Sequence, residues 1–281
     1  MDPHTAVPAR TGVVVGTDGS ATALRAVAWA ATEARLRGTG LTIVHAAPYA
    51  DSAPARRHAE GILGRARTVA RRHEPGLSVS TRTLDAEPGI AVPRAAADAE
   101  LLVVGMVGEH LSDALTSSVA TTVAANAPCT VAVVRGPRQS HASTRPVLLA
   151  VTDPDADRAA VDAAFADADR HSSAVLVVQA THDSAAGDRL EAALQHWRDR
   201  YPDVRVEVRT ERGNVIKVLL GAASGARLVV AGSPGRGALA RAVLGSTSRS
   251  LVRLSPCPVM VVPRSAAVAV PPVTTAAERT P

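Results

Sequence analysis

The sequence predicts an α/β protein built from two tandem domains, each an open, parallel, five-stranded sheet with helices on both faces. Two observations predict this architecture. Short apolar segments rich in Val and Leu alternate along the chain with longer segments of helical periodicity, and this alternation is typical of parallel sheets whose crossovers are helices. The whole series of segments also occurs twice in the same order, which indicates a duplicated domain.

The duplication is visible as matching segments at a nearly constant separation. Three segments of the first half have a counterpart in the second half: LLVVGMVG matches RLVVAGSPG, NAPCTVAVV matches LSPCPVMVV, and GVVVGTDGS matches VLLAVTDPD. Corresponding residues in these segments are Gly105 and Gly232 (127 apart), Cys129 and Cys257 (128 apart), and Asp18 and Asp153 (135 apart). A unit of about 130 residues is the size of a domain. We therefore place domain 1 at residues 11–136 and domain 2 at residues 145–264, followed by a tail at 265–281 that we expect to be disordered.

Each half is expected to contain five strands and four helices. In the first half we expect strands near residues 12–17, 41–47, 77–84, 101–106 and 130–134, and helices near 21–38, 56–73, 90–100 and from 115 onward. Ser20 suits the N-cap of the first helix, and Gly38 ends that helix. Pro93 is expected near the first turn of the third helix. In the second half, the apolar face of residues 188–201 predicts a single helix.

Composition excludes several classes of protein. Hydrophobic residues make up 46% of the chain, enough for two cores, whereas aromatic residues make up only 2%. The net charge of +5 comes mostly from scattered arginines, and so few aromatic side chains cannot form stacking platforms for nucleic acid. The arginine-rich segment 56–73 keeps its apolar residues on one face, so we interpret its arginines as a solvated surface. We expect no nucleic-acid partner.

The cysteines and the apolar runs predict the compartment. Cys129 and Cys257 make neither a disulfide framework nor a metal site, and we interpret both as small buried residues. The N-terminus MDPHTAVPAR lacks the apolar core of a signal peptide, and no apolar run approaches the roughly 18 residues of a membrane span. We therefore expect a cytoplasmic protein with no membrane partner.

Two loops at the ends of predicted strands have the chemistry of a nucleotide site. Thr17-Asp18-Gly19-Ser20 follows the first strand, and GSPGRGALARAVLGST, from Gly232 to Thr247, begins where the fourth strand of the second half ends. A strand-end carboxylate can accept hydrogen bonds from a ribose or a base, and a glycine-rich loop before a helix exposes N–H groups to phosphate. In open parallel sheets, ligands bind at these carboxyl ends of the strands. A tight turn without a ligand is the alternative interpretation of the glycines.

Together, these segments resemble the universal stress protein family. The pattern consists of G-x2-G-x9-G-[ST] after an LVV strand, V-G-x-D-G-S at the end of the first strand, and Pro-Cys before the last strand. The chain resembles a tandem member of the ATP-binding branch. The resemblance implies a Rossmann-like sheet of strand order 3-2-1-4-5, ATP at the glycine loop, and pairing through the last strands, which could join TVAVV to PVMVV within one chain.

The resemblance also implies which residues hold the nucleotide. In the first half the candidates are Gly16, Asp18, Val44, Gly105, Gly108, Ser117 and Ser118. In the second half they are Val151, Asp153, Gly232, Ser233, Gly235, Arg236, Gly237, Gly245, Ser246 and Thr247.

Each half departs from the family pattern in one place. The first half has Ser117-Ser118 where the pattern has Gly-Ser, with eight residues in the preceding interval instead of nine. A serine there would oppose a positive φ or a close approach of the backbone to phosphate.

In the second half, Pro154-Asp155 replaces Gly19-Ser20. Acidic residues at 153, 155 and 157 disfavour an anionic ligand unless a cation intervenes, and we interpret Asp155 and Asp157 as helix-capping residues. We expect at least one nucleotide per chain and leave a second one open.

The sequence favours binding over catalysis. The Walker pattern GxxxxGK[ST], a strand-end GxGxxG and the GxSxG elbow are all absent, and we predict no catalytic residue and no metal ligand. His45 is interpreted as structural rather than as a contact to the base. By resemblance we predict an ATP-binding stress-response regulatory protein that acts through nucleotide-dependent conformation or partner binding.

Several points stay open at this level. AMP or cyclic AMP as the ligand, an accompanying Mg²⁺, the protein partner and a homodimer of chains are all undecided. A slow ATP hydrolase and a nucleotide-free scaffold are the alternative functions.

Overall fold

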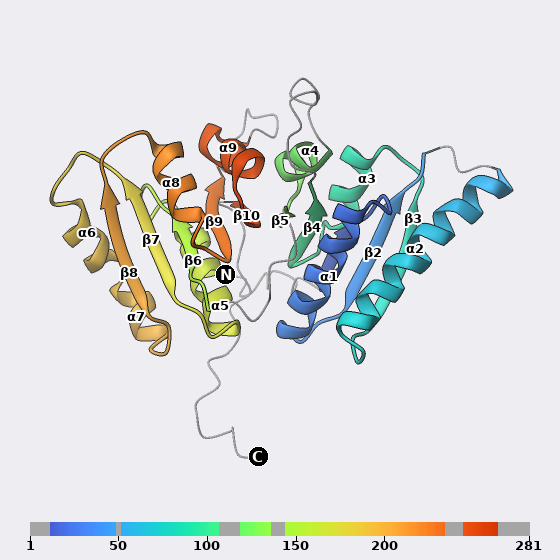
Figure 1. The fold of residues 1–281 in the computed structure, drawn as a ribbon, viewed down its shortest axis with the longest axis horizontal. Helices are drawn as coiled ribbons and strands as arrows, with labels where there is room; N and C mark the ends of the chain where they lie inside the picture. Colours follow the sequence, from blue (N-terminus) through green and yellow to red (C-terminus); the bar gives the residue numbers. More distant parts are fainter. Residues whose placement is uncertain (1–11, 49–51, 107–118, 136–143, 234–243, 264–281) are drawn as a thin grey trace, which may run out of the picture.

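The computed structural model describes residues 12–48, 52–106, 119–135, 144–233 and 244–263. These residues form two α/β halves on either side of a central seam (Figure 1). The strands are β1 (Val13–Gly16), β2 (Leu41–Ala46), β3 (Val79–Leu84), β4 (Leu101–Gly105) and β5 (Thr130–Val134) in the first half, and β6 (Val147–Ala150), β7 (Val175–Ala180), β8 (Val206–Glu211), β9 (Leu228–Ser233) and β10 (Val259–Pro263) in the second. The helices are α1 (Ala21–Leu36), α2 (Ala53–His73), α3 (Pro88–Ala95), α4 (Val119–Asn126), α5 (Arg158–Arg170), α6 (Ala186–Ala193), α7 (Gln195–Arg200), α8 (Val215–Ala223) and α9 (Ser246–Leu254).

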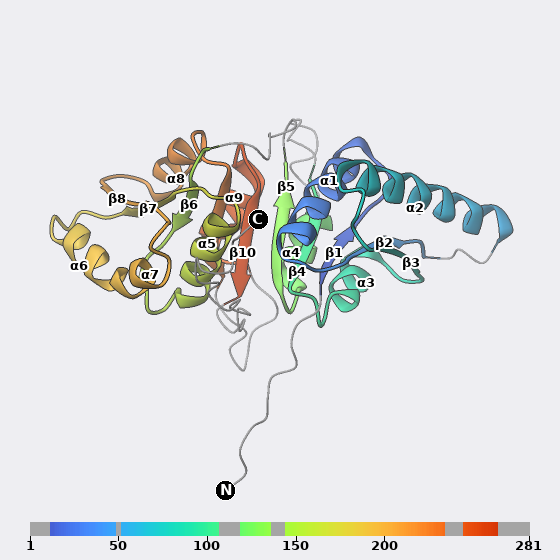
Figure 2. The same ribbon diagram turned by 90° about the horizontal axis from the view of Figure 1, so that it is seen from below.

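The ten described strands belong to one sheet, in the order β3-β2-β1-β4-β5-β10-β9-β6-β7-β8. Within each half the strands run parallel and follow the order 3-2-1-4-5, so the predicted α/β fold is confirmed. The halves meet at β5 and β10, which pair antiparallel, with Val131–Val133 opposite Val259–Val261. The expected pairing of last strands thus joins the two halves of one chain into a continuous sheet (Figure 2).

The strand register defines which residues of the two halves are equivalent. Val13 pairs with the first residues of β2 and β4, and Val147 pairs with the first residues of β7 and β9. Equivalent residues of the two halves are therefore 134 positions apart in the first and second strands of each half, and 127 positions apart in the fourth strand. In the last strands the separation is 128, and Ala132 pairs with Met260, its own equivalent. A pseudo-twofold axis therefore passes through this pair.

Helices cover both faces of the sheet, and each face has one apolar core. The core under α1, α2, α5, α6 and α7 includes Ala132 and Met260, and the core under α3, α4, α8 and α9 includes Val131 and Val261. Alternate residues of a strand point to opposite faces, so both cores run across the seam between the halves. Alanine and valine dominate both cores, as the low aromatic content predicts.

Helix α1 begins and ends at the expected signals. Ser20 is its N-cap, and the Oγ atom of Ser20 accepts a hydrogen bond from the Ala23 N–H at 3.2 Å. Arg37 ends the helix, and Gly38 then takes a left-handed φ of +65°. The Ser20 cap fixes the first turn of α1 directly after the end of β1, at the carboxyl edge of the sheet.

Two predicted helices differ from the observed ones. The single helix expected over 188–201 is divided at Leu194, where the Trp197 N–H bonds to the Leu194 carbonyl in a tighter three-residue turn. This tightening accompanies burial of Trp197, whose Nε1 donates to Asp162 at 2.7 Å. The helix expected from residue 90 begins instead at Pro88, which occupies the first turn, so Pro93 lies inside it.

Among the described residues, no helix combines the length and the apolar character needed to cross a lipid bilayer.

Candidate functional site

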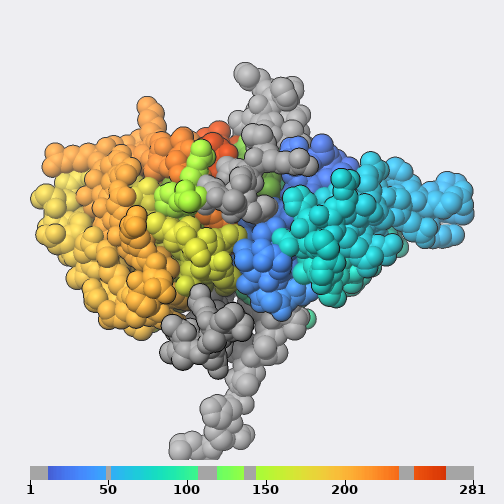
Figure 3. Space-filling model, turned by 60° about the horizontal axis from the view of Figure 1, so that its bottom comes forward, coloured from blue at the N-terminus to red at the C-terminus, as the bar shows by residue number. Residues whose placement is uncertain are grey.

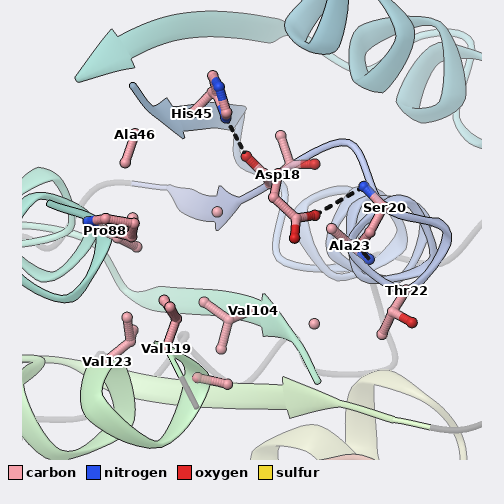
Figure 4. Close-up of a pocket in the computed structure, with 15 residues that line it drawn as sticks. Asp18, Ser20, Thr22, Ala23, His45, Ala46, Pro88, Val104, Val119 and Val123 are labelled. Atoms are coloured by element: carbon pink, nitrogen blue, oxygen red, sulfur yellow. Dashed lines mark hydrogen bonds between the residues drawn. The ribbon is translucent and has the colours of Figure 1, made fainter. Parts of the chain in front are cut away.

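A pocket opens at the carboxyl edge of the first half, with a cavity volume of about 150 Å³. It lies between the end of β1, the end of β2 and the end of β4, and the first turn of α1 closes one side (Figure 4). Its polar lining comes from Thr17, Asp18, Ser20, Thr22 and His45, and its apolar lining comes mainly from Pro88, Val92, Val104, Val119 and Val123. The pocket therefore has one polar wall and one apolar wall, an arrangement typical of small-molecule sites.

The polar wall is shaped by the turn from Thr17 to Ser20. Gly19 has a φ of +81°, and a Cβ on it would lie 3.2 Å from Ile62 of α2, so both conformation and space favour glycine there. One carboxylate oxygen of Asp18 accepts the Ser20 N–H at 2.9 Å. This bond fixes the Asp18 side chain at the mouth of the pocket, where the residue is exposed.

His45 connects the end of β2 to the same turn. Its Nδ1 lies 2.8 Å from the Thr17 carbonyl oxygen (Figure 4). A carbonyl can only accept, so Nδ1 carries the proton and, in the neutral ring, Nε2 carries a lone pair. This contact supports the structural interpretation of His45 while keeping the ring in the lining of the pocket.

Two glycines allow the elements around the pocket to approach closely. A Cβ on Gly16 would lie 3.3 Å from Val92 of α3. A Cβ on Gly105 would lie 2.9 Å from the Thr22 carbonyl oxygen and 3.0 Å from the backbone of Ala23, both in the first turn of α1. Gly105 therefore lets α1 pack against the end of β4 at backbone distance.

The structure brings three predicted first-half residues together, because Gly16, Asp18 and Gly105 all line the pocket. Val44 lies beside it in β2, with its carbonyl oxygen accepting the Thr17 N–H at 2.9 Å. Gly108, Ser117 and Ser118 lie outside the described residues. The apolar wall from α3 and α4 was not predicted, since nothing in the local pattern of Pro88 or Val119 indicates which strand end these helices face.

The equivalent strand end in the second half is built differently. The Val151 N–H donates to Val178 at 3.4 Å, as Thr17 does to Val44, and Gln179 replaces His45 and donates to the Thr152 carbonyl at 2.6 Å. Seven residues connect β6 to α5, against four between β1 and α1. The strand register ends at Gly16 and Ala150, and beyond it the contacts match Asp153 with Asp18: the equivalent residues His45 and Gln179 each bond the carbonyl directly before that aspartate.

Asp153 and Asp157 hold this longer connection together. Asp153 Oδ1 accepts the Asp155 N–H at 3.0 Å. Asp157 is the N-cap residue of α5, as the capping interpretation expects, but its side chain makes no capping hydrogen bond there. Its Oδ2 accepts the Thr152 N–H at 3.3 Å instead, and its Oδ1 lies 2.6 Å from where a Cβ on Gly232 would be.

The buried Asp157 carboxylate thus occupies the space above the end of β9. Gly232, equivalent to Gly105, faces this carboxylate, whereas Gly105 faces helix backbone. A buried carboxylate at this place repels an anionic ligand.

The other second-half candidates lie near the end of β9 and the start of α9. Gly232 and Ser233 end β9, and the Ser248 hydroxyl donates to the Gly232 carbonyl at 2.8 Å. Gly245 is the N-cap of α9 with a φ of −56°, and Ser246 and Thr247 begin the helix. Because any residue adopts that φ, backbone conformation does not require glycine at 245, and a positive φ is not the reason for the Gly-Ser pattern here. Gly235, Arg236 and Gly237 lie outside the described residues.

Comparisons with known proteins agree with the fold and its duplication. The model of the universal stress protein family matches residues 10–135 and again 143–263. A universal stress protein of Mycolicibacterium smegmatis is 32% identical over 285 residues, which cover 89% of this chain and 96% of the relative. The chain belongs to the universal stress protein family.

Solved structures of universal stress proteins match either most of this chain or less than half of it. A universal stress protein from Archaeoglobus fulgidus covers 90% of this chain and 98% of its own length, with a TM-score of 0.70 and 19% identity, a likeness in fold. Another, from the same organism and in complex with dAMP, covers 44% of this chain and 96% of its own, with a TM-score of 0.37 and 27% identity.

Proposed function

We propose that this protein binds one adenine nucleotide per chain in the first-half pocket, and that the bound nucleotide regulates the protein instead of being turned over. The observation that carries the proposal is the position of Asp18. Its exposed carboxylate stands at the mouth of a half-apolar pocket, at the carboxyl ends of β1 and β4, in a chain of the universal stress protein family. This is the place where open parallel sheets bind nucleotides.

Each wall of the pocket suits one part of a nucleotide. Val92, Val104 and Val119 offer apolar surface for the flat base. The Asp18 carboxylate can accept hydrogen bonds from ribose hydroxyls or from an exocyclic amine. The first turn of α1 contains no acidic residue, so the partial positive charge of the helix N-terminus favours an anionic group there.

The proposal gives the second half no nucleotide. Asp157 places a buried carboxylate against Gly232. Bringing phosphate to this strand end would set like charges together at low dielectric. The role of the second half is then to pair with the first half, without binding a nucleotide of its own.

Regulation is proposed instead of catalysis because the described lining offers few reactive groups. Asp18 and His45 are the titratable residues among the described lining residues, and His45 already donates from Nδ1 to Thr17. A hydrolase needs a group that activates water near the terminal phosphate. Among adenine nucleotides we propose ATP, following the family resemblance.

Calorimetric titration of the nucleotide-stripped chain with ATP, with and without Mg²⁺, tests the proposal, and AMP and cyclic AMP are titrated in parallel. We expect one site per chain. Asp18→Ala should weaken binding about tenfold or more, which corresponds to about 1.4 kcal/mol. Asp153→Ala, the matched control in the second half, should leave the affinity unchanged.

The possible outcomes separate the alternatives. Asp18→Asn retains an oxygen that can accept the Ser20 N–H, so weaker binding by this variant as well would assign the effect to the lost charge rather than to the turn. Absence of heat and of any thermal shift with all three nucleotides would leave a scaffold without a nucleotide. Multiple-turnover release of phosphate from ATP would indicate a hydrolase instead.

A further inference from the structure

A cluster of buried charged side chains lies where α1 of the first half meets α5 of the second. Glu33 and Arg37 come from α1 and its C-cap. Asp167, Arg170 and His171 come from α5 and its C-cap, and Glu100 and Arg227 directly precede β4 and β9. Figure 3 shows the blue surface of α1 next to the yellow surface of α5. The side chains of Glu33 and Asp167 are 0% exposed. Buried charges are tolerated only when they are paired.

The contacts in this cluster join the halves. Across the boundary, the Glu33 carboxylate lies 2.8 Å from His171 Nε2, and Arg170 lies 3.9 Å from Glu100. Within the halves, Arg37 pairs with Glu33 at 3.4 Å and with Glu100, while Arg227 pairs with Asp167 at 2.6 Å.

The proton on His171 can be assigned from its neighbours. Arg227 Nη2 lies 2.9 Å from His171 Nδ1. A guanidinium can only donate, so Nδ1 accepts and Nε2 carries the proton that is donated to Glu33. With His171 neutral, the cluster holds three carboxylates and three guanidinium groups among the described residues, and its charges balance.

The same assignment argues against a metal ion at this place. Glu33, Asp167 and His171 offer atoms within 4.8 Å of one another, and Asp167 Oδ1 has no hydrogen-bond partner among the described residues. Coordination by Nε2 would move the ring proton to Nδ1, where it would face the Arg227 N–H. It would also add two positive charges to a cluster that is already neutral.

The members of the cluster are equivalent residues of the two halves. At the separation of 134, Glu33 corresponds to Asp167 and Arg37 to His171, and both Arg37 and His171 cap the ends of their helices. At the separation of 127, Glu100 corresponds to Arg227. The halves therefore carry opposite charges at the position before the fourth strand. Arg170 corresponds to the uncharged Leu36.

We infer that these differences make each half fit the unlike half rather than a second copy of itself. Two first halves joined about the same axis would bury four carboxylates and two guanidinium groups. Two second halves would bury two carboxylates and four guanidinium groups. Only the unlike pair is neutral, and an unbalanced buried charge is strongly destabilising. The strands β5 and β10 hold two halves together but do not favour unlike over like halves, because the residues that face each other are apolar in both strands.

The test uses the full chain with a protease site inserted between Arg135 and Thr144. The chain is folded, cleaved, and taken through mild denaturant so that the halves can exchange partners, and native mass spectrometry then counts like and unlike pairs. We expect the unlike pair to exceed the like pairs by about tenfold or more, equivalent to about 1.4 kcal/mol. Arg227→Glu should lower that ratio about tenfold. Arg209→Glu, an exposed control on β8, should not change it.

The wild-type measurement keeps the inference falsifiable even if Arg227→Glu fails to fold. A statistical mixture of like and unlike pairs from the wild-type chain would overturn it. An unchanged ratio in a folded Arg227→Glu variant would overturn it as well. The proposed nucleotide site plays no part in this test, so its failure and the failure of this inference are independent.

Discussion

The connection after the first strand differs between the two halves, although the strands around it have the same order and direction. In the first half, four residues lead from β1 to α1 and leave the Asp18 carboxylate exposed at a pocket. In the second, seven residues lead from β6 to α5 and bury the Asp157 carboxylate against Gly232. The fold depends on apolar strands that are buried on both faces. Ligand binding depends on a few loop residues, and those can change without loss of the fold.

The interface between the halves differs in the same way. Its strands pair symmetrically through Ala132 and Met260, but the equivalent residues Glu100 and Arg227 have opposite charges. Duplication supplied two copies of one surface, and a few charged positions made them complementary. Both differences can be tested by changing equivalent residues in parallel.

The largest effect is expected from Glu33→Gln, which removes one charge from the interface between the halves. Burial alone would raise the pKa of Glu33, but the hydrogen bond from His171 and the charge of Arg37 lower it from 4.5 to about 2. Because the folded-state pKa is lowered, the stabilisation is complete above pH 4.5 and is lost as the pH falls toward 2. The variant should lose about 3 kcal/mol of the free energy of unfolding at neutral pH.

Denaturant unfolding between pH 7 and pH 2.5 measures this effect. The variant should show a smaller loss of stability on acidification than the wild type. Glu207→Gln, an exposed carboxylate paired with Arg209, is the control and should follow the wild-type curve. Equal pH dependence in Glu33→Gln and wild type would contradict the prediction.

The next largest effect is a difference in the loss of stability between substitutions at the two equivalent glycines, Gly105 and Gly232. Gly105→Ala puts a methyl group against the backbone of Thr22 and Ala23, and α1 must shift to accommodate it. Gly232→Ala puts the methyl group against the end of the Asp157 side chain, which can rotate away. We expect a loss of about 2 kcal/mol for Gly105→Ala and less than about 1 kcal/mol for Gly232→Ala, since overpacking costs more where backbone must move. Thermal unfolding of both variants measures the difference, and equal losses would show that the two strand ends are packed alike.

The difference between these glycines marks the limit of what could be predicted from sequence. The repeated apolar segments predicted the strands. The family resemblance predicted the strand order and the placement of Gly16, Asp18 and Gly105 in one site. Neither could predict where Asp157 turns its carboxylate, because that depends on the path of a loop three residues longer than its equivalent.

The charged cluster between the halves was missed for a related reason. Glu33, Glu100 and Arg227 are far apart in sequence, and each resembles an ordinary surface charge until the halves are paired.

A smaller effect is expected from Asp157→Ala, which removes the carboxylate that distinguishes the second strand end. Loss of the bond to the Thr152 N–H should lower the free energy of unfolding by about 1 kcal/mol. On the proposed function, the same change should also admit a second, weaker nucleotide, because the like charge next to Gly232 is gone. Calorimetric titration with ATP then gives a stoichiometry between one and two per chain. Asp155→Ala, in the same connection but exposed, should keep one site, and an unchanged stoichiometry in Asp157→Ala would show that another feature closes the second half.

The smallest effect is expected where the two halves perform the same task with different side chains. His45 and Gln179 are equivalent, and each donates one hydrogen bond to the carbonyl of the loop after the first strand, from Nδ1 to Thr17 and from Nε2 to Thr152. His45→Gln should therefore change the free energy of unfolding by less than about 0.5 kcal/mol, whereas His45→Ala should lose about 1 kcal/mol with the bond. Denaturant titrations of the two variants measure the difference. If His45→Gln preserved the stability but weakened nucleotide binding as much as His45→Ala, the ring would have a role in the pocket beyond holding Thr17, and the two strand ends would differ in one more residue.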